Sequence, residues 1–163
     1  MEGDHPAVSS ADSEQTPVRI ELEYERRFNW AFQQNEIPFI RCIRIHNRST
    51  FPLEDLRVRL HGEPTGSLEW NTRISLIPPS STYNLSPIPV GFSPQFLLDV
   101  TERTNGLLRV DAGREAEILG SIACPFEILA RNEWCGIHSL PEILAAFVLP
   151  NDKSVQEVLM RTR

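Results

Sequence analysis

Alternation of apolar and polar side chains is the feature of this sequence that most restricts its fold. Val18, Ile20, Leu22 and Tyr24 alternate with charged residues at every position between them. Successive side chains of a β-strand point to opposite faces of a sheet, so this period of two predicts a strand with one buried and one solvated face. The sequence therefore favours a fold that starts from half-buried strands.

The same alternation recurs through most of the chain. It predicts further strands over 37–45, 56–60, 68–76, 83–85, 108–110 and 116–122. Apolar residues on both faces of the segment 37–45, with Ile40 on the face opposite Ile43, predict that this strand is central in its sheet. Pro87 and Pro89 confine the strand at 83–85 to an edge.

Three local signals refine the strand pattern. Trp70 and Leu76 share the predicted buried face of their strand. A hairpin turn is predicted at 112–114, and Pro125 is predicted to interrupt the strand that returns from it. Ser93 followed by Pro94 predicts the capped start of a short helix.

Taken together, these segments predict an all-β fold. About seven or eight short strands, with turns roughly every ten residues, are typical of an immunoglobulin-like β-sandwich, here spanning residues 18–131. The tryptophan and cysteine spacing of antibody domains is missing, so a disulfide between Cys42 and Cys124 is not assumed.

The two ends of the chain differ from this pattern. Residues 1–17 carry four acidic residues, no lysine or arginine and almost no apolar residue, so a disordered acidic tail is predicted. Residues 132–163 are predicted to form a short C-terminal helical extension, or a linker to a following domain. Ser139 and Glu142 have the spacing of a capping box, and Pro150 ends the first helix.

Length and composition exclude several classes of protein. A chain of 163 residues is enough for about one domain. Three cysteines are too few for a disulfide framework, no apolar run reaches the length of a membrane helix, and the start lacks a secretory signal. We therefore expect a cytoplasmic protein that does not bind a membrane. The chain also lacks the glycine-rich motif of P-loop ATPases and dinucleotide-binding enzymes.

Arginines on the predicted strands are the best candidate binding residues. Arg41, Arg44 and Arg48 crowd one strand and the turn after it, whereas Arg57 and Arg59 share a face of the next strand. If these two strands are neighbours, the arginines form a basic patch that could bind nucleic-acid phosphates with salt-dependent affinity. The alternative is a solvated sheet face on which glutamates and aspartates pair with the arginines.

The sequence offers little support for metal binding or catalysis. Cys135 and His138 supply at most half of a zinc site, which needs about four ligands. No nucleophile motif such as Gly-x-Ser-x-Gly is present. We therefore expect no catalytic residue, no metal and no cofactor. Trp30, Trp70 and Trp134 are expected in the core, and Trp134 could also anchor the helical extension.

The segment 132–151 has the most distinctive sequence of the chain. It reads NEWCGIHSLPEILAAFVLPN and resembles the segment that closes the N-terminal domain of a family of large bacterial helicase-like proteins. Residues 28–35, 37–40 and 53–56 resemble the opening of the same domain. These proteins resemble superfamily I DNA helicases with an AAA-type ATPase core and a restriction-endonuclease-like C-terminal domain. The resemblance covers about residues 19–163 and implies a setting in DNA metabolism or antiphage defence. The ATPase motifs and nuclease carboxylates of the family lie outside this region, so no catalytic residue is implied here.

These observations favour a non-catalytic accessory or protein-interaction domain. Its expected partners are the following domains of a larger protein, or another protein. Docking to a following domain is assigned to Trp134, Leu140, Leu144 and Phe147. The alternative is a nucleic-acid-positioning module that uses the strand arginines. A small enzyme, as a third class, would need a deep polar pocket, which we do not expect.

Overall fold

The computed structural model describes residues 8–9, 16–63, 68–115 and 117–133, which are mostly strands. The elements in chain order are β1 (Val8–Ser9), β2 (Val18–Tyr24), β3 (Arg27–Phe28), α1 (Trp30–Gln34), β4 (Ile40–Asn47), β5 (Leu53–Glu63), β6 (Glu69–Ile77), β7 (Thr82–Leu85), α2 (Pro94–Asp99), β8 (Thr104–Arg114) and β9 (Glu117–Ile128). The prediction of an all-β fold is confirmed. None of the helices in the described ranges is both long and apolar enough to cross a membrane.

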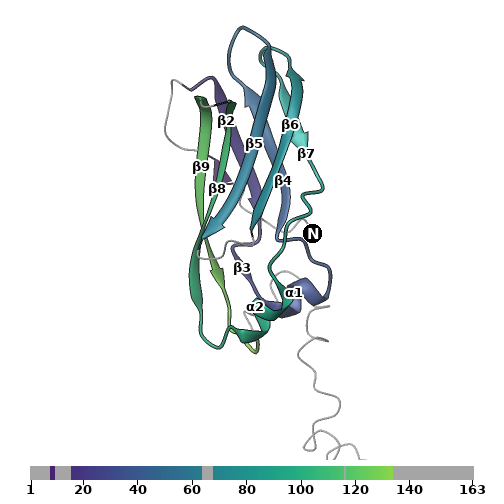
Figure 1. The fold of residues 1–163 in the computed structure, drawn as a ribbon, viewed down its shortest axis with the longest axis vertical. Helices are drawn as coiled ribbons and strands as arrows, with labels where there is room; N and C mark the ends of the chain where they lie inside the picture. The colour runs from purple at the N-terminus through teal and green to yellow at the C-terminus, as the bar shows by residue number, and fades with distance from the viewer. Residues whose placement is uncertain (1–7, 10–15, 64–67, 116, 134–163) are drawn as a thin grey trace, which may run out of the picture.

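The strands form two sheets (Figure 1). Sheet A has the strand order β1-β2-β4-β7, and sheet B has the order β3-β9-β8-β5-β6. All neighbouring strands are antiparallel except β3 and β9, which are parallel. As predicted, β4 is central in its sheet and β7 lies at an edge.

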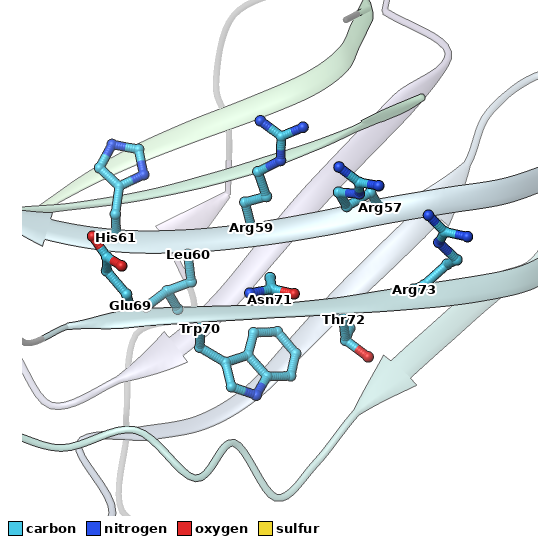
Figure 2. A pocket seen from close by; sticks show the side chains of 9 residues that line it. All are labelled: Arg57, Arg59, Leu60, His61, Glu69, Trp70, Asn71, Thr72 and Arg73. Carbon is cyan, nitrogen blue, oxygen red and sulfur yellow. The ribbon is translucent and has the colours of Figure 1, made fainter. Parts of the chain in front are cut away.

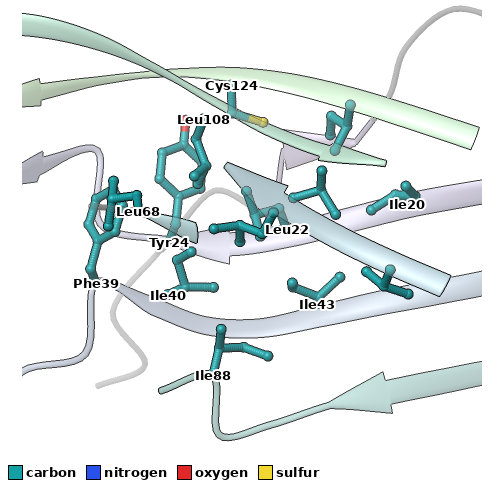
Figure 3. Packing of buried hydrophobic residues seen from close by; sticks show 14 of the residues in the cluster. Ile20, Leu22, Tyr24, Phe39, Ile40, Ile43, Leu68, Ile88, Leu108 and Cys124 are labelled. Atoms are coloured by element: carbon teal, nitrogen blue, oxygen red, sulfur yellow. The ribbon is translucent and has the colours of Figure 1, made fainter. Parts of the chain in front are cut away.

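Both sheets contribute to one hydrophobic core (Figure 3). Ile20 and Leu22 of β2 are fully buried in the same cluster as Val58 of β5 and Leu108 of β8. Burying an aliphatic side chain of this size contributes roughly 1.5–3 kcal/mol. The apolar residues of the alternating pattern therefore fill the space between the sheets.

Phenylalanines fill one end of this core. The ring centroids of Phe39 lie 5.3 Å from Phe28, 5.0 Å from Phe92 and 5.2 Å from Phe126. The irregular apolar run that starts at Phe28 becomes β3 and α1 because buried Asn29 caps the helix through its side chain, 3.1 Å from the Ala31 amide. Short elements therefore complete this end of the core beside the long strand β9, which contributes Phe126.

A bulge corrects one detail of the predicted strand at 37–45. Glu23 lies opposite Cys42 and Tyr24 lies opposite Ile40, which leaves Arg41 as an extra residue in β4. The extra residue turns Ile40 inward, where it is fully buried with Ile43. The prediction that Ile40 lies on the face opposite Ile43 is therefore wrong.

The hairpin between β8 and β9 lies later in the chain than predicted. β8 continues through the predicted turn at 112–114, and its register shifts between Ala112 and Gly113. A Cβ atom on Gly113 would collide with the backbone oxygen of Glu117. Gly113 therefore permits a close approach of two strands at a bulge, not a turn.

Pro125 does not interrupt β9, contrary to the prediction. Backbone N–H groups point to alternate sides of a strand, and the amide of Glu127 donates to the Arg26 carbonyl at 2.8 Å. The backbone nitrogen of Pro125 therefore also points toward β3, away from β8. A proline there removes no hydrogen bond to β8, so the strand continues.

The predicted phase of residues 68–76 holds only for part of β6. Ile74 is buried as expected, but Leu76 is 49% exposed and Ile77 is fully buried. Glu54 still lies opposite Leu76, and Leu56 lies opposite Ile74. Asp55, between them on β5, has a φ of 51°, which resets the alternation of both paired strands. Leu76 is therefore a surface residue.

Other predictions can be compared only in part. Val8–Ser9 pairs with β2, so the predicted disorder of 1–17 does not hold for these two residues, and residues 1–7 and 10–15 lie outside the described ranges. Pro94 starts α2 as predicted, but the Ser93 hydroxyl makes no capping hydrogen bond. Cys42 and Cys124 are free thiols. The helical extension from residue 134 onward lies outside the described residues.

Candidate binding surface

The structure does not bring the five predicted arginines together. Arg41 and Arg44 lie on β4 in sheet A, and Arg48 follows that strand in a loop. Arg57 and Arg59 lie on β5 in sheet B. Because β4 and β5 belong to different sheets, the single patch expected from neighbouring strands does not form. Four of the arginines instead lie on two separate sheets, and Arg48 lies in the loop after β4.

On the outer face of sheet A, basic side chains pair with carboxylates from β2 and the residue after it. A guanidinium nitrogen of Arg41 lies 2.6 Å from Glu25, and one of Arg44 lies 2.8 Å from Glu23. Glu21 accepts a third pair, from Arg19 at 3.0 Å. The hydrogen bond to Glu23 is the largest cause that raises the pKa of Arg44 above its usual value. This face is the predicted alternative of a sheet surface whose charges neutralise one another.

The outer face of sheet B carries a different arrangement. The alternation of β5, β6 and β8 places four arginines there, which we call the sheet B arginine face: Arg57, Arg59, Arg73 and Arg109. Within the described residues the side chains of Arg57 and Arg109 form no ion pair or hydrogen bond. Arg59 donates only to the backbone oxygen of Glu115, at 3.3 Å. Arg57, Arg59 and Arg109 therefore lack the carboxylate partners that the arginines of sheet A have.

Among the described residues, Arg73 forms the one ion pair of the sheet B arginine face. Its Nε lies 3.2 Å from Asp55, but both side chains are largely exposed, at 59% and 66%. Exposed pairs of this kind contribute little, typically below about 1 kcal/mol. Arg73 also lies directly opposite Arg57 across the β5–β6 pair, and like charges in that position repel. The face therefore remains able to attract an anion.

An open hollow of about 520 Å³ lies along β5 and β6 at this face (Figure 2). In Figure 2 the side chains of Arg57, Arg59 and Arg73 project to one side of the two strands, whereas Trp70 and Thr72 project to the other side of β6. All five consecutive residues from Glu69 to Arg73 line the hollow. Neighbouring side chains of a strand point to opposite faces of the sheet. The hollow therefore runs along the length of β6 and is not confined to the outer face.

A smaller hollow of about 130 Å³ lies on the other side of Arg57 and Arg59 and is more acidic. Asp111, Glu115 and Glu117 line it with the two arginines. The Asp111 carboxylate accepts a hydrogen bond from Ser121 at 2.6 Å. The acidic residues therefore lie toward β8 and β9, and the basic character of the face is greatest toward β6.

The described residues contain neither a candidate metal cluster nor a thiol with a lowered pKa. No group of three or more His, Cys, Asp or Glu side chains within these ranges could hold a metal ion. Burial is the largest cause that raises the pKa of the Cys42 and Cys124 thiols, which makes both poor nucleophiles. Cys135 and His138 lie outside the described residues.

Some of the predicted aromatic and docking residues lie within the described ranges, and others lie outside them. Trp30 and Trp70 are partly buried and pack against the core. The interdomain docking residues all lie beyond residue 133, outside the described residues: Trp134, Leu140, Leu144 and Phe147. These assignments remain predictions.

Arg73 and Arg109 belong to the sheet B arginine face but were not predicted from the sequence as binding residues. The alternation around Trp70 and Ile74 does place Arg73 on the solvated face of its strand. What the sequence does not contain is which strands are neighbours, since β5 pairs with the distant β8 as well as with β6. The sequence therefore indicates that each arginine faces solvent, but it does not indicate that the four arginines lie together.

Comparison with protein-family models and with curated proteins finds no match to this chain. The candidate surface is therefore interpreted from its own geometry and charge.

Proposed function

We propose that this chain is a non-catalytic protein-interaction domain that recognises an anionic partner through the sheet B arginine face. The observation that carries the proposal is the set of arginines without carboxylate partners: Arg57, Arg59 and Arg109, next to the weakly paired Arg73. Guanidinium groups suit carboxylates and phosphates because they donate several hydrogen bonds in one plane. The open hollow beside β6 gives an elongated ligand access to Arg57, Arg59 and Arg73.

The overall architecture supports a binding role more than a catalytic one. Two sheets that share one core are compatible with the immunoglobulin-like β-sandwich expected from the sequence. Such a fold presents sheet faces, edges and loops as recognition surfaces. We propose this sandwich type as the architecture of the chain.

The resemblance of the segment 132–151 supports a place for the domain within a larger protein. We propose that the domain belongs near the N-terminus of a helicase-like protein in the cytoplasm, and acts in DNA metabolism or antiphage defence. The residues from Trp134 onward, including Leu140, Leu144 and Phe147, would then dock onto a following domain.

Nucleic-acid positioning is the second candidate, because phosphates would satisfy the same arginines. It would now rest on Arg57 and Arg59 with Arg73 and Arg109, since Arg41 and Arg44 are already paired with glutamates. Among the described residues, Trp70 is the one aromatic side chain that lines the hollow, and it is partly buried and projects away from the arginines, so it is poorly placed to stack on bases. The protein partner is therefore the favoured candidate.

Binding of defined polyanions by the full chain tests both candidates. The probes are a poly-glutamate peptide and single- and double-stranded DNA oligonucleotides, and the variant is Arg57→Glu with Arg59→Glu. We expect the peptide to bind and the variant to lose at least about tenfold in affinity, because two charged contacts become repulsive. The matched control is Arg48→Glu, which reverses an exposed charge in the loop between β4 and β5, outside the sheet B arginine face.

The outcomes separate the two candidates. Binding of DNA but not of the peptide, with affinity that falls steeply with salt, would favour nucleic-acid positioning. If neither probe binds, or if Arg48→Glu weakens binding as much as the double variant, the sheet B arginine face is not the recognition surface.

A further inference from the structure

The edge strand β6 has a free side. It is nine residues long, and within the described ranges it pairs only with β5. An exposed edge strand presents unpaired backbone N–H and C=O groups that can template another strand. Figure 1 shows β6 at the margin of sheet B.

One hydrogen bond identifies which backbone groups of β6 are free. The Gly62 amide donates to the Leu68 carbonyl at 3.0 Å, and these residues continue the register in which Leu60 lies opposite Trp70. In an antiparallel pair, residues that exchange hydrogen bonds recur at every second position. Trp70 and Thr72 therefore direct their backbone groups toward β5. The intervening residues, Glu69, Asn71 and Arg73, direct theirs toward the free edge.

These three residues are complementary to themselves. If β6 of a second copy pairs antiparallel about a two-fold axis at Asn71, then Asn71 faces Asn71 of the second copy. Glu69 then faces Arg73 of the second copy, and Arg73 faces Glu69. Each of these pairs has its backbone groups directed toward the other strand, so each can close its N–H···O=C bonds.

The charges favour this register over its neighbours. An axis at Trp70 or Thr72 would place Glu69 or Arg73 opposite Asn71 and would lose both ion pairs, and an axis at Arg73 would place two arginines opposite each other. Within one chain Arg73 lies opposite Arg57, where two like charges repel. In the register centred on Asn71, the Glu69 carboxylate of the second copy lies on the other side of Arg73 and offsets that repulsion.

We propose that this chain forms a symmetric dimer in which β6 pairs antiparallel with β6 of a second copy, centred on Asn71. A two-fold interface of this kind uses the same patch on both copies and closes without further growth. It joins the two B sheets into one, so that the arginines of both copies lie on a continuous face. The dimer rests on edge geometry and does not require the function proposed above.

Charge exchange across the interface is the decisive test. Arg73→Glu and Glu69→Arg are made separately in the full chain, and association is measured by sedimentation over a range of concentrations. Wild type is expected to dimerise with rising concentration. Each variant alone is expected to raise the dissociation constant about tenfold or more, since two symmetry-related attractive pairs become repulsive. An equimolar mixture of the two variants is expected to dimerise again, because each then supplies the charge the other lacks.

A backbone variant gives an independent readout. Asn71→Pro removes an N–H that points to the free edge, so it is expected to abolish dimerisation while the hydrogen bonds between β5 and β6 remain. Circular dichroism checks that the strands are retained, and Arg48→Glu is the control for a remote charge change. A monomeric wild type at every accessible concentration, or a mixture that associates no better than its components, would overturn the proposal.

Discussion

The two outer faces of this molecule use similar residues in opposite ways. On sheet A, Arg41 and Arg44 each approach a glutamate of the preceding strand region to within 2.8 Å or less. On sheet B, Arg57 has no such partner among the described residues and lies opposite another arginine. The difference teaches that an arginine on a half-buried strand becomes a structural or a binding residue according to its cross-strand neighbour.

The neighbours differ because the strands that flank β4 and β5 differ in charge. β2, beside β4, has glutamates at positions 21 and 23 on its solvated face. β6, beside β5, has Asn71 opposite Arg59 and Arg73 opposite Arg57. On the other side of β5, β8 places Asp111 opposite Arg59, but this carboxylate accepts its hydrogen bond from Ser121. Opposite charges directly across a strand pair stabilise it, whereas like charges destabilise it. Sheet A therefore gains stability from its outer face, and sheet B keeps its charges available.

The largest expected effect separates Arg41 from Arg57. Glu25 is buried, at 7% exposed, so Arg41→Ala would leave its carboxylate without a cationic partner. We expect a loss of about 2 kcal/mol in the free energy of unfolding, measured with a chemical denaturant. Arg57→Ala is expected to change stability by less than about 0.5 kcal/mol, because it breaks no described contact.

A second substitution tests the cause of the Arg41 effect. Adding Glu25→Gln to Arg41→Ala removes the unpaired charge, so part of the lost stability should return. If Arg41→Ala costs no more than Arg57→Ala, the two faces do not differ in the way described.

The sequence predicts which face of each strand is buried, but it does not predict which strands are neighbours. Alternation around Ile20 and Val58 identified the buried face of each strand, because burial of apolar side chains repeats with the period of the strand. Pairing partners depend on contacts between distant segments, and these leave no periodic signal. The two arginine groups were consequently expected on neighbouring strands and lie on separate sheets.

The errors in strand detail have a common physical cause. Arg41 enters a bulge, Asp55 adopts a positive φ, and Pro125 faces a side of β9 where it removes no hydrogen bond to β8. Each feature depends on the strand next to it, not on the residue's own preference. The sequence therefore predicts the existence of strands more reliably than their phase and ends.

A partly buried hydrogen bond from the inner face of β2 sharpens the comparison. The Tyr24 hydroxyl donates to the Pro125 carbonyl of β9 at 2.8 Å, which ties sheet A to sheet B. Burial is the main cause that raises the pKa of Tyr24 from 10.0 to about 12. Because the folded state favours the neutral phenol, the contribution of Tyr24 to the free energy of unfolding is fully present below about pH 10. It is lost as the pH rises toward 12.

Tyr24→Phe tests this connection between the sheets. We expect a loss of about 1 kcal/mol near neutral pH, measured with denaturant, because the Pro125 carbonyl loses its donor. Between about pH 10 and 12, wild type is expected to lose stability more steeply than the variant. Equal alkaline slopes in the two proteins would show that Tyr24 titrates normally.

Coupling within individual ion pairs is expected to be smaller. A double-mutant cycle on Glu23 and Arg44, whose side chains are about one-third exposed, should give about 0.5–1 kcal/mol. The same cycle on Asp55 and Arg73, which are mostly exposed, should give less than about 0.3 kcal/mol. Equal coupling at the two sites would mean that Arg73 is as firmly paired as Arg44.

Salt should produce the smallest difference and test both faces at once. Added sodium chloride screens the attraction in the sheet A pairs and the repulsion between Arg57 and Arg73, so the net change in wild-type stability is expected to be only a few tenths of a kcal/mol. Arg57→Ala removes the repulsive part, so its unfolding free energy should fall more with salt than that of wild type. Sedimentation at matched protein concentration separates this effect from any change in dimer population. An identical salt response in the two proteins would mean that Arg57 and Arg73 do not repel each other measurably, and the contrast between the two faces would then rest on the sheet A pairs alone.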